Sequence, residues 1–272
     1  MLCLVYGSDE VSGLKYLVLI QARCGSSRLP NKVLKEIASK TDLQWVLERV
    51  KRSKKIDEVM VITSIEKNNV PLIKLCTELD TRIFVGSEDD VLDRYYQAAR
   101  LLQPEYVIRI TADCPLFDWN YLDLAIEQLK PETDYLAEMT ESFPDGLDIE
   151  IMRFSVLKEA WENAKMASER EHVTLYIRKH AEDYKIQNFE CPIPGIGNKR
   201  WTLDEPADLE LIEKIYGHFI DAGKEDFTTE DILRFLEKNP ELEDINSMIG
   251  RNEGLRKSLD NDQILDIDNA QA

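Results

Sequence analysis

Short apolar runs alternate with helical periods along most of this chain. The runs with the length and composition of buried strands are 17–20, 56–62, 82–85, 105–110, 134–139, 147–151 and 184–189. Helical periods separate them, at 43–50, 70–79, 91–102, 121–129, 154–164, 169–179 and from 206 to 216. This alternation predicts an α/β fold with a mostly parallel sheet and helices on both faces. Ligands of such sheets bind at the carboxyl ends of the strands, so the residues that follow each strand are the candidates for a site.

The chain has 272 residues, 43% of them hydrophobic and 32% charged, which suits one large domain with a substantial core. Its net charge of −18 and pI near 4.7 argue against nucleic acid as a partner, because binding a phosphate backbone needs a broad basic face. No apolar run reaches the roughly 18 residues of a membrane span. We predict an N-terminal extension at 1–14, a main domain at 15–240, and a polar tail at 241–272 with a surface helix and a frayed end.

The cysteines and histidines indicate neither a disulfide framework nor a zinc site. The five cysteines are scattered, without a Cys-x-x-Cys pair: Cys3, Cys24, Cys76, Cys114 and Cys191. The three histidines add no metal-ligand spacing. Free thiols fit a reducing compartment, and Asp9 and Glu10 stand where a signal peptide would be positively charged. We therefore expect a cytoplasmic protein.

The stretch from Leu17 to Lys32 is the first candidate for a ligand site. An apolar strand runs into a small-residue turn at Gly25, Ser26 and Ser27, and the cations Arg23, Arg28 and Lys32 bracket that turn. Free backbone N–H groups and fixed cations after a strand can hold an anion such as a triphosphate. Taken alone, the loop is more typical of an ordinary turn with surface cations.

Asp113 and Asp204 are candidate ligands of a divalent cation. Each follows a predicted strand and precedes a proline by two residues, in Asp113-Cys114-Pro115 and Asp204-Glu205-Pro206. Carboxylate oxygens at one sheet edge suit Mg²⁺, which prefers hard oxygen ligands. Each aspartate alone also fits a turn or a helix start.

Three further polar stretches leave two interpretations open. The acids at 88–90 are more typical of a helix N-terminus than of a ligand contact. A Pro-Asp-Gly turn at 144–146 precedes Asp148 and Glu150, which share a face of a predicted strand and either face solvent or orient a hydroxylated substrate. Ser168 and Glu171 form a capping pattern, and Arg170 and His172 either lie on an exposed helix face or contact a sugar or carboxylate.

Several separated blocks of the sequence resemble one family. The string IQARCGSSRLPNKVLKEI resembles the signature of sugar-activating cytidylyltransferases, which make CMP-ketodeoxyoctonate and CMP-sialic acid. Five further blocks resemble the spore-coat polysaccharide biosynthesis branch, over about residues 15–220: GSEDDVLDRYYQAA, RITADCPL, FPDGLDIEI, SEREHVTLYIRK and RWTLDEPADLELI.

The resemblance implies a Rossmann-like nucleotidyltransferase fold and transfer of CMP from CTP to a sugar or sugar acid, with release of pyrophosphate. It implies catalytic roles for Arg23, Lys32, Asp113 and Asp204, the two aspartates holding Mg²⁺. The implied nucleotide contacts are Gln21, Ala22, Arg23, Gly25, Ser26, Arg28, Lys32, Ser87, Arg109, Thr111 and Asp113. The implied sugar contacts are Asp145, Gly146, Asp148, Glu150, Arg170, Glu171, His172 and Thr174. Relatives pair through the region around 143–151, so we expect a homodimer.

The chain departs from the family signature at two positions of the first loop. Gln21 replaces a common proline, and Ser27 stands where a lysine is common, so Arg28 or Lys32 has to compensate for one phosphate-facing cation. Nothing in the spacing distinguishes cytosine from uracil, and none of the cysteines needs a catalytic role.

Two rival functions were weighed against this one. A nucleotide-sugar-dependent glycosyltransferase would carry an Asp-x-Asp metal triplet after a strand. Such triplets occur here only in the polar tail, at Asp260/Asp262 and Asp266/Asp268. A non-catalytic sugar- or nucleotide-binding module would not need Asp113, Asp204 and Lys32 together.

Overall fold

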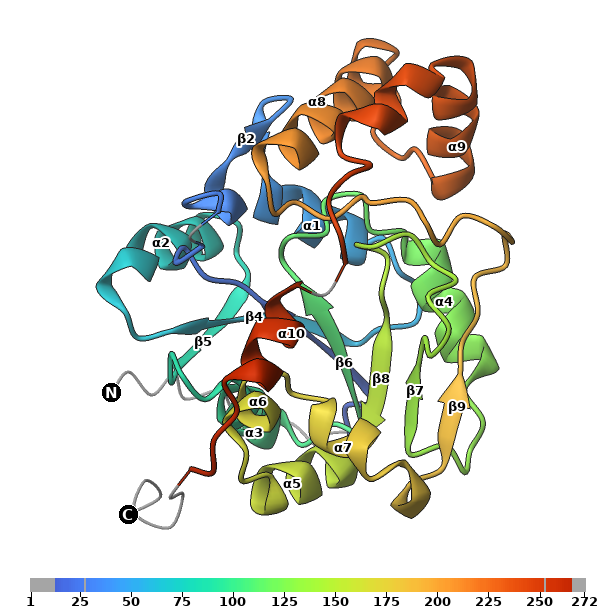
Figure 1. Ribbon diagram of the computed structural model, residues 1–272. Helices are drawn as coiled ribbons and strands as arrows, with labels where there is room; N and C mark the ends of the chain where they lie inside the picture. The colour runs from blue at the N-terminus through green and yellow to red at the C-terminus, as the bar shows by residue number, and fades with distance from the viewer. Residues whose placement is uncertain (1–12, 27, 252, 266–272) are drawn as a thin grey trace.

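A computed structural model describes residues 13–26, 28–251 and 253–265 of the chain. Its main sheet has seven strands in the order β5-β4-β1-β6-β8-β7-β9. Strands β5, β4, β1 and β6 are mutually parallel, and β8 runs antiparallel to β6 and β7. The predicted mostly parallel α/β sheet is confirmed (Figure 1). The strands are β1 (Tyr16–Gln21), β4 (Glu58–Ser64), β5 (Arg82–Gly86), β6 (Tyr106–Thr111), β7 (Tyr135–Ala137), β8 (Glu150–Arg153) and β9 (Ile186–Asn188).

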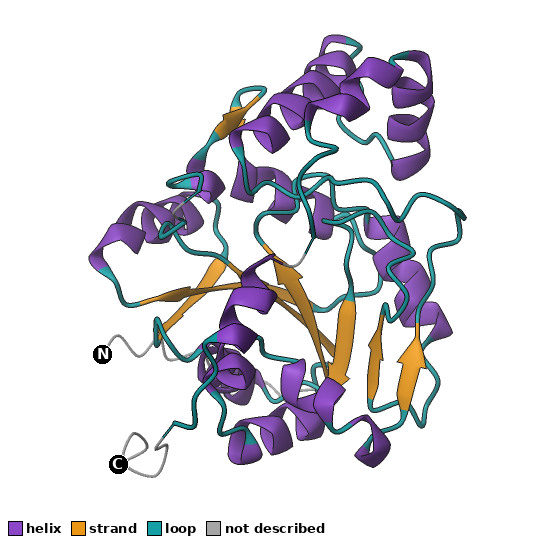
Figure 2. Cartoon of the chain, in the orientation of Figure 1, coloured by secondary structure: helices purple, strands orange, loops and turns teal. Residues whose placement is uncertain are grey.

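Two hydrophobic cores lie on opposite faces of this sheet, because successive strand residues point to opposite sides. On β1, Val18 and Ile20 pack into one core, and Leu17 and Leu19 into the other; all four are fully buried. The first core joins α1 (Asp42–Val50), α2 (Val70–Glu78), α4 (Trp119–Gln128), α8 (Pro206–Asp221) and α9 (Thr229–Lys238). The second joins α3 (Val91–Leu102), α5 (Phe154–Asn163) and α7 (Leu175–Lys179). Figure 2 shows helices on both sides of the strands, as the alternation predicts.

The region predicted as one helix over 169–179 is two short helices, α6 (Ala167–Glu171) and α7. The break falls at His172, whose φ of −103° and ψ of 59° are not helical. The strand predicted to start at 147 begins only at Glu150, because the preceding turn places Gly146 at φ 104°. Both differences turn polar residues of the chain toward one cavity, described below.

Three elements were not anticipated. Strands β2 (Glu36–Ile37) and β3 (Lys40–Thr41) form a hairpin through Ala38 and Ser39, which have φ of 46° and 72° without a glycine to signal the turn. Helix α9 was missed as well. Short 3₁₀ turns complete the description: η1 (Lys32–Leu34), η2 (Lys67–Asn69), η3 (Ala181–Asp183) and η4 (Pro240–Ile245).

The segment predicted as a polar tail contains the expected helix, α10 (Glu253–Asp260), but residues up to 265 are held against the rest of the chain. Ile264 bridges to Met166, and Asp262 accepts hydrogen bonds from the backbone and side chain of Ser168. Residues 1–12, Ser27 and 266–272 lie outside the described residues, so the predicted extension, part of the first turn and the Asp266/Asp268 triplet are not described. No helix among the described residues is long and apolar enough to cross a membrane.

The region expected to pair two subunits is occupied within one subunit. Phe143, Leu147 and Ile149 are buried in the first core, with at most 2% of each residue exposed. They therefore present no apolar face to a second copy, and the homodimer stays a prediction.

Candidate active site

Lys32, Asp113 and Asp204 meet at the carboxyl edge of the sheet, although they lie far apart in the sequence. The Nζ of Lys32 lies 2.5 Å from Asp113 Oδ2 and 2.5 Å from Asp204 Oδ1. The backbone joins the same two loops, since the N–H of Leu203 donates to the carbonyl of Asp113 at 2.8 Å. The structure thus brings together the lysine and both aspartates that the sequence pointed to.

These three groups hold one another in their charged forms. Burial opposes the charge on Lys32, but Asp113 and Asp204 outweigh it and raise the pKa of the amine above its ordinary value. Burial likewise favours a neutral Asp113, yet Lys32 prevails and lowers the pKa of that carboxyl to about 2. At neutral pH both members of the Lys32–Asp113 pair are therefore ionised.

Asp113 and Asp204 can hold a divalent cation only if a bound phosphate and water supply the remaining oxygen ligands. Asp113 and Asp204 supply hard oxygens, and Arg28 lies on the other side of Asp204, with NH2 3.2 Å from its Oδ2. Within the described ranges, no group of three or more histidine, cysteine, aspartate or glutamate side chains could hold a metal ion. A cation at these two aspartates would need phosphate oxygens and water for the remaining positions.

The first loop curls beside the ends of β4 and β5. The guanidinium of Arg23 pairs with Glu88 at 2.9 Å, and the N–H of Cys24 donates to Asn69 Oδ1 at 2.8 Å. A Cβ on Gly25 would lie 3.8 Å from both Asn68 and Glu88, so the loop passes close to both side chains. The candidates Gln21, Ala22, Ser26 and Ser87 lie around the same strand ends and outside the cavity described below.

Arg94 in α3 was missed from the sequence. It is fully buried, and none of its three guanidinium nitrogens has a hydrogen-bond partner among the described residues. Burial lowers its pKa, while Glu88 raises it and Arg23 lowers it, so it lies within electrostatic reach of that ion pair. A buried cation without a hydrogen-bond partner is costly, and for Arg94 the charges of Glu88 and Asp90 offset part of that cost. Its only sequence signal is a charge within an otherwise buried helix stretch.

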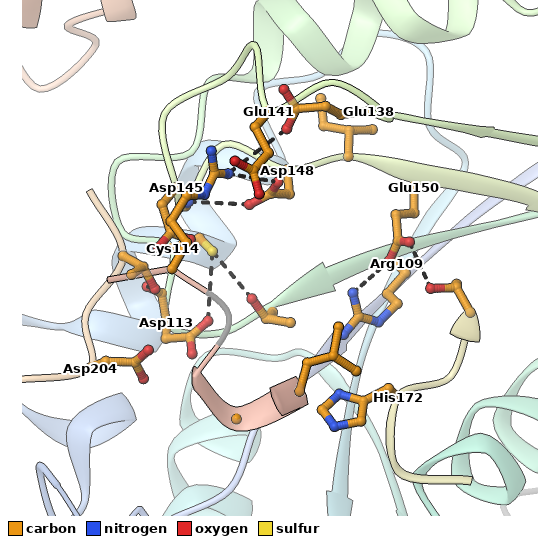
Figure 3. A pocket seen from close by; sticks show the side chains of 18 of the residues that line it. Arg109, Asp113, Cys114, Glu138, Glu141, Asp145, Asp148, Glu150, His172 and Asp204 are labelled. Atoms are coloured by element: carbon orange, nitrogen blue, oxygen red, sulfur yellow. Dashed lines mark hydrogen bonds and ion pairs between the residues drawn. The ribbon is translucent and has the colours of Figure 1, made fainter. Parts of the chain in front are cut away.

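A cavity of about 470 Å³ lies between β6, β8, the loop 138–148 and the C-terminal segment. Eleven of the predicted site residues line it: Arg28, Arg109, Thr111, Asp113, Asp145, Gly146, Asp148, Glu150, His172, Thr174 and Asp204. Three of them form a row, because Arg109, Thr111 and Asp113 alternate along β6 and its continuation. Figure 3 shows Asp113 and Asp204 at one corner, and Arg109, Glu150 and His172 on the far side.

The far side of the cavity is organised around Glu150. This carboxylate is 2.6 Å from Arg109 and 3.3 Å from Arg178, and accepts a hydrogen bond from Thr174 at 2.8 Å and another from the hydroxyl of Tyr135. Burial would raise its pKa, but the two arginines prevail and lower it to about 2. Glu150 therefore stays charged and fixes Arg109, whose Nε is buried without a partner among the residues described.

The loop 138–148 forms an acidic wall, defined here as Glu138, Glu141, Asp145 and Asp148 (Figure 3). Arg200 pairs with Asp145 at 2.9 Å and makes two 2.9 Å bonds to the fully buried Asp208. Arg251 faces two of the other three acids, with NH2 3.5 Å from Asp148 and 3.9 Å from Glu138.

Two residues predicted to contact the sugar lie elsewhere. The side chain of Arg170 is 2% exposed and bonds both oxygens of Asp90, the N-cap of α3, at 2.5–3.0 Å. Glu171 accepts a hydrogen bond from Ser258 in α10. Neither lines the cavity, so both connect helices instead of reaching a ligand. Conversely, the sequence did not single out several residues that do line it, namely Cys114, Glu138, Glu141, Arg178, Arg200, Thr202 and Arg251.

Residues 17–245 match the sequence model of the cytidylyltransferase family. The chain belongs to this family, which confirms the family and enzyme class that the sequence blocks implied.

Individual relatives agree with this assignment. An uncharacterised protein of Methanocaldococcus jannaschii is 39% identical over 241 residues, covering 87% of this chain and 96% of that protein. The spore coat polysaccharide biosynthesis protein SpsF of Bacillus subtilis is 33% identical, covering 83% and 95%. A 3-deoxy-manno-octulosonate cytidylyltransferase of Solibacter usitatus is 32% identical, covering 74% and 69%. Among solved structures, a cytidylyltransferase from Leptospira borgpetersenii superposes with a TM-score of 0.81 at 29% identity, covering 88% of this chain and all of that one.

Proposed function

We propose that this enzyme transfers CMP from CTP to a hydroxyl of a sugar or sugar acid and releases pyrophosphate, as a step in surface polysaccharide synthesis. The observation that carries the proposal is the meeting of Lys32, Asp113 and Asp204 at the mouth of a polar cavity large enough for a sugar. This arrangement places a phosphate-binding region and an acceptor region side by side, as nucleotidyl transfer requires.

The triphosphate would lie along the first loop, against Arg23, Arg28 and Lys32. Asp113 and Asp204 would hold a divalent cation, proposed to be Mg²⁺, which when bound neutralises phosphate charge. Asp113, with a pKa of about 2, is a weak base. The residues therefore act by positioning and by compensating charge on the leaving pyrophosphate, and not by strong proton abstraction.

Covalent catalysis by a cysteine does not fit this site. Cys114 lines the cavity. Burial raises the pKa of its thiol well above the ordinary value, and the negative charge of Asp113 raises it further. A neutral thiol is a poor nucleophile. Direct attack by the acceptor hydroxyl is the reaction that the side chains support.

Arg94 and Glu88 favour cytosine over uracil. Cytosine presents two acceptors, O2 and N3, beside a donor amino group, so an arginine and a carboxylate together complement its edge. Uracil presents an N3–H and a second carbonyl at the same edge. Its N3–H would face the donors of the arginine, and its O4 would face the carboxylate, so neither would form a hydrogen bond. Burial opposes the charge of Glu88, yet Ser64 and Arg23 prevail and lower its pKa, so it stays an acceptor.

Pyrophosphate release tests the proposal. Purified enzyme with Mg²⁺, a panel of sugars and sugar acids, and either CTP or UTP should release pyrophosphate with CTP and at least one acceptor. Release from a finished nucleotide-sugar, with no pyrophosphate from CTP, would support a glycosyltransferase instead. The structure gives that rival little support, because Asp262 of the Asp260/Asp262 triplet is bonded to Ser168.

A further inference from the structure

Residues 246–251 and 253–265, here called the strap, run from one side of the acceptor cavity to the other. Figure 1 shows α10 of the strap in front of the carboxyl end of β6. Four strap residues line the cavity: Gly250, Arg251, Gly254 and Leu255. The family match ends at residue 245, so the strap adds a wall from outside the matched region.

Both ends of the strap are anchored by specific bonds. At the start, the buried side chain of Asn246 donates to the carbonyl of Arg200 at 3.0 Å and to Asp208 at 2.9 Å. At the end, Asp262 accepts from Ser168, and the N–H of Leu265 donates to the carbonyl of Lys165 at 2.8 Å. The strap is therefore positioned as part of the site.

Arg251 is the strap residue that acts on the acidic wall. Its NH1 donates to the carbonyls of Phe143 and Gly197, at 3.1 Å each, and so pins the two loops that flank the wall. Its NH2 faces Asp148 and Glu138. The side chain is 18% exposed, so these contacts are made where water is scarce.

The wall has few other cations. Arg200 is already bonded to Asp208 and Asp145. Arg178 donates to the backbone carbonyl of Glu138 at 3.3 Å and pairs with Glu150. Among the described residues that line the cavity, Arg251 is the one whose guanidinium pairs with the carboxylates of Glu138 and Asp148. Removing its charge would leave Glu138, Glu141 and Asp148 without a guanidinium partner in the described part of the chain, while Asp145 keeps Arg200. Burial raises the pKa of Asp148 to about 7, so the charge of this wall is carried mainly by the other acids. Such a wall attracts an ammonium group and still accepts hydrogen bonds from hydroxyls.

We propose that Arg251 determines acceptor specificity: it closes the acceptor cavity and lowers the negative charge of its wall, so that the enzyme discriminates against acceptors with an amino group there. The inference rests on the proposed function, in that the cavity is taken as the acceptor site.

The test compares two sugars that differ in one group, 3-deoxy-manno-octulosonate and its 8-amino-8-deoxy analogue. Calorimetry gives the affinity of each for wild type, Arg251→Ala, Arg251→Lys and Lys257→Ala. The last variant is the control, because Lys257 is exposed on α10 of the same strap and does not line the cavity. In Arg251→Ala the affinity ratio should move about tenfold toward the amino sugar, which is ~1.4 kcal/mol. Arg251→Lys keeps the charge and Lys257→Ala keeps the wall, so both should stay within about twofold of wild type.

An unchanged ratio in folded Arg251→Ala would overturn the proposal, and so would failure of both sugars to bind wild type. If Arg251→Ala does not fold, Arg251→Gln keeps donors for the two carbonyls without the charge and should show the same shift. CTP affinity should not change in any variant. Pyrophosphate release from CTP with some other acceptor would leave the proposed function intact while this inference fails.

Discussion

The two ends of the site are built differently. At the nucleotide end, Arg23, Arg28 and Lys32 come from one short loop. The two arginines are partly exposed, with 46% of the Arg23 side chain and 34% of Arg28 accessible, and Lys32 is more buried, at 13%. At the acceptor end, Arg109, Arg200 and Arg251 come from separate elements, and each is bonded to a carboxylate. The family resemblance implied a nucleotide contact for Arg109, but its position beside Glu150, across the cavity from Asp113, favours the acceptor.

This difference indicates how each end meets its ligand. The partly exposed ion pairs of Arg23 with Glu88, and of Arg28 with Asp204 and Glu205, can be exchanged for phosphate oxygens at modest cost, because surface ion pairs contribute little. Buried, multiply bonded arginines keep their positions, since separating them is costly. We infer that the nucleotide end reorganises when CTP binds and that the acceptor end is already in place.

The largest effect is expected at the junction of the two ends. Asp113→Asn removes a carboxylate from Lys32 and from the proposed metal position, and should lower kcat by about 10³-fold, in the range seen for removing transition-state charge stabilisation. The measurement is steady-state pyrophosphate release, with Asp260→Asn on exposed α10 as the control. A kcat of Asp113→Asn within threefold of the wild-type value would contradict a catalytic role for Asp113.

Glu150→Gln tests whether the acceptor end is preformed. The change leaves Arg109 and Arg178 without their shared carboxylate and should lower the free energy of unfolding by about 3 kcal/mol. It should also raise KM for the acceptor and not for CTP. Urea unfolding and separate KM values measure this, and Glu162→Gln, in an exposed pair with Lys158, should cost under ~1 kcal/mol. Equal costs for the two variants would contradict a preformed acceptor end.

Lys32→Ala tests whether Asp113 and Asp204 at the nucleotide end can hold a divalent cation. Without the amine, Asp113 and Asp204 repel each other, so stability should fall by about 2 kcal/mol. Mg²⁺ should then raise the melting temperature of this variant more than that of wild type, because a bound ion replaces the lost charge. An equal Mg²⁺ response in both proteins would count against a cation at these aspartates.

Arg94→Met should separate binding from stability. Removing a buried guanidinium that has no hydrogen-bond partner among the described residues should leave the melting temperature unchanged or raise it. CTP affinity should fall about tenfold, which corresponds to one lost charged hydrogen bond. Calorimetry with CTP and UTP checks this, with Arg100→Met, exposed on the same helix, as the control. A fall in stability with intact CTP affinity would make Arg94 purely structural.

A smaller effect is expected from pH. The folded-state pKa values of Asp113 and Glu150 are lowered to about 2, below the roughly 4 of unfolded chains. The contribution of these two carboxylates to the free energy of unfolding is therefore complete above about pH 5. It is lost as the pH falls from about 4 to about 2. Urea midpoints at pH 6 and pH 3 should differ less in Glu150→Gln than in wild type. Equal differences would mean that Glu150 is not held charged by its arginines.

The same contrast explains what could be predicted from the sequence. The order of strands and helices, the first loop, Asp113 and Asp204 are local patterns beside strand ends, and parallel topology gathers strand ends at one edge. At the acceptor end, the family blocks pointed to Asp145, Asp148 and Glu150, which do line the cavity. Contacts between distant residues, such as Arg251 with Phe143, could not be predicted, because no local pattern encodes them. Arg170 is a residue for which the local motif misled. Its motif predicted a contact with the sugar, but in the structure its guanidinium pairs with Asp90, which is distant in the sequence.

A crystal structure with a non-hydrolysable CTP analogue and Mg²⁺ tests the division into two ends most directly. We predict that the triphosphate lies beside Arg23, Arg28 and Lys32 and the base beside Arg94, with the cavity beneath α10 left free for the acceptor. A nucleotide lying in the cavity beneath α10, against Arg109 and the acidic wall, would contradict it.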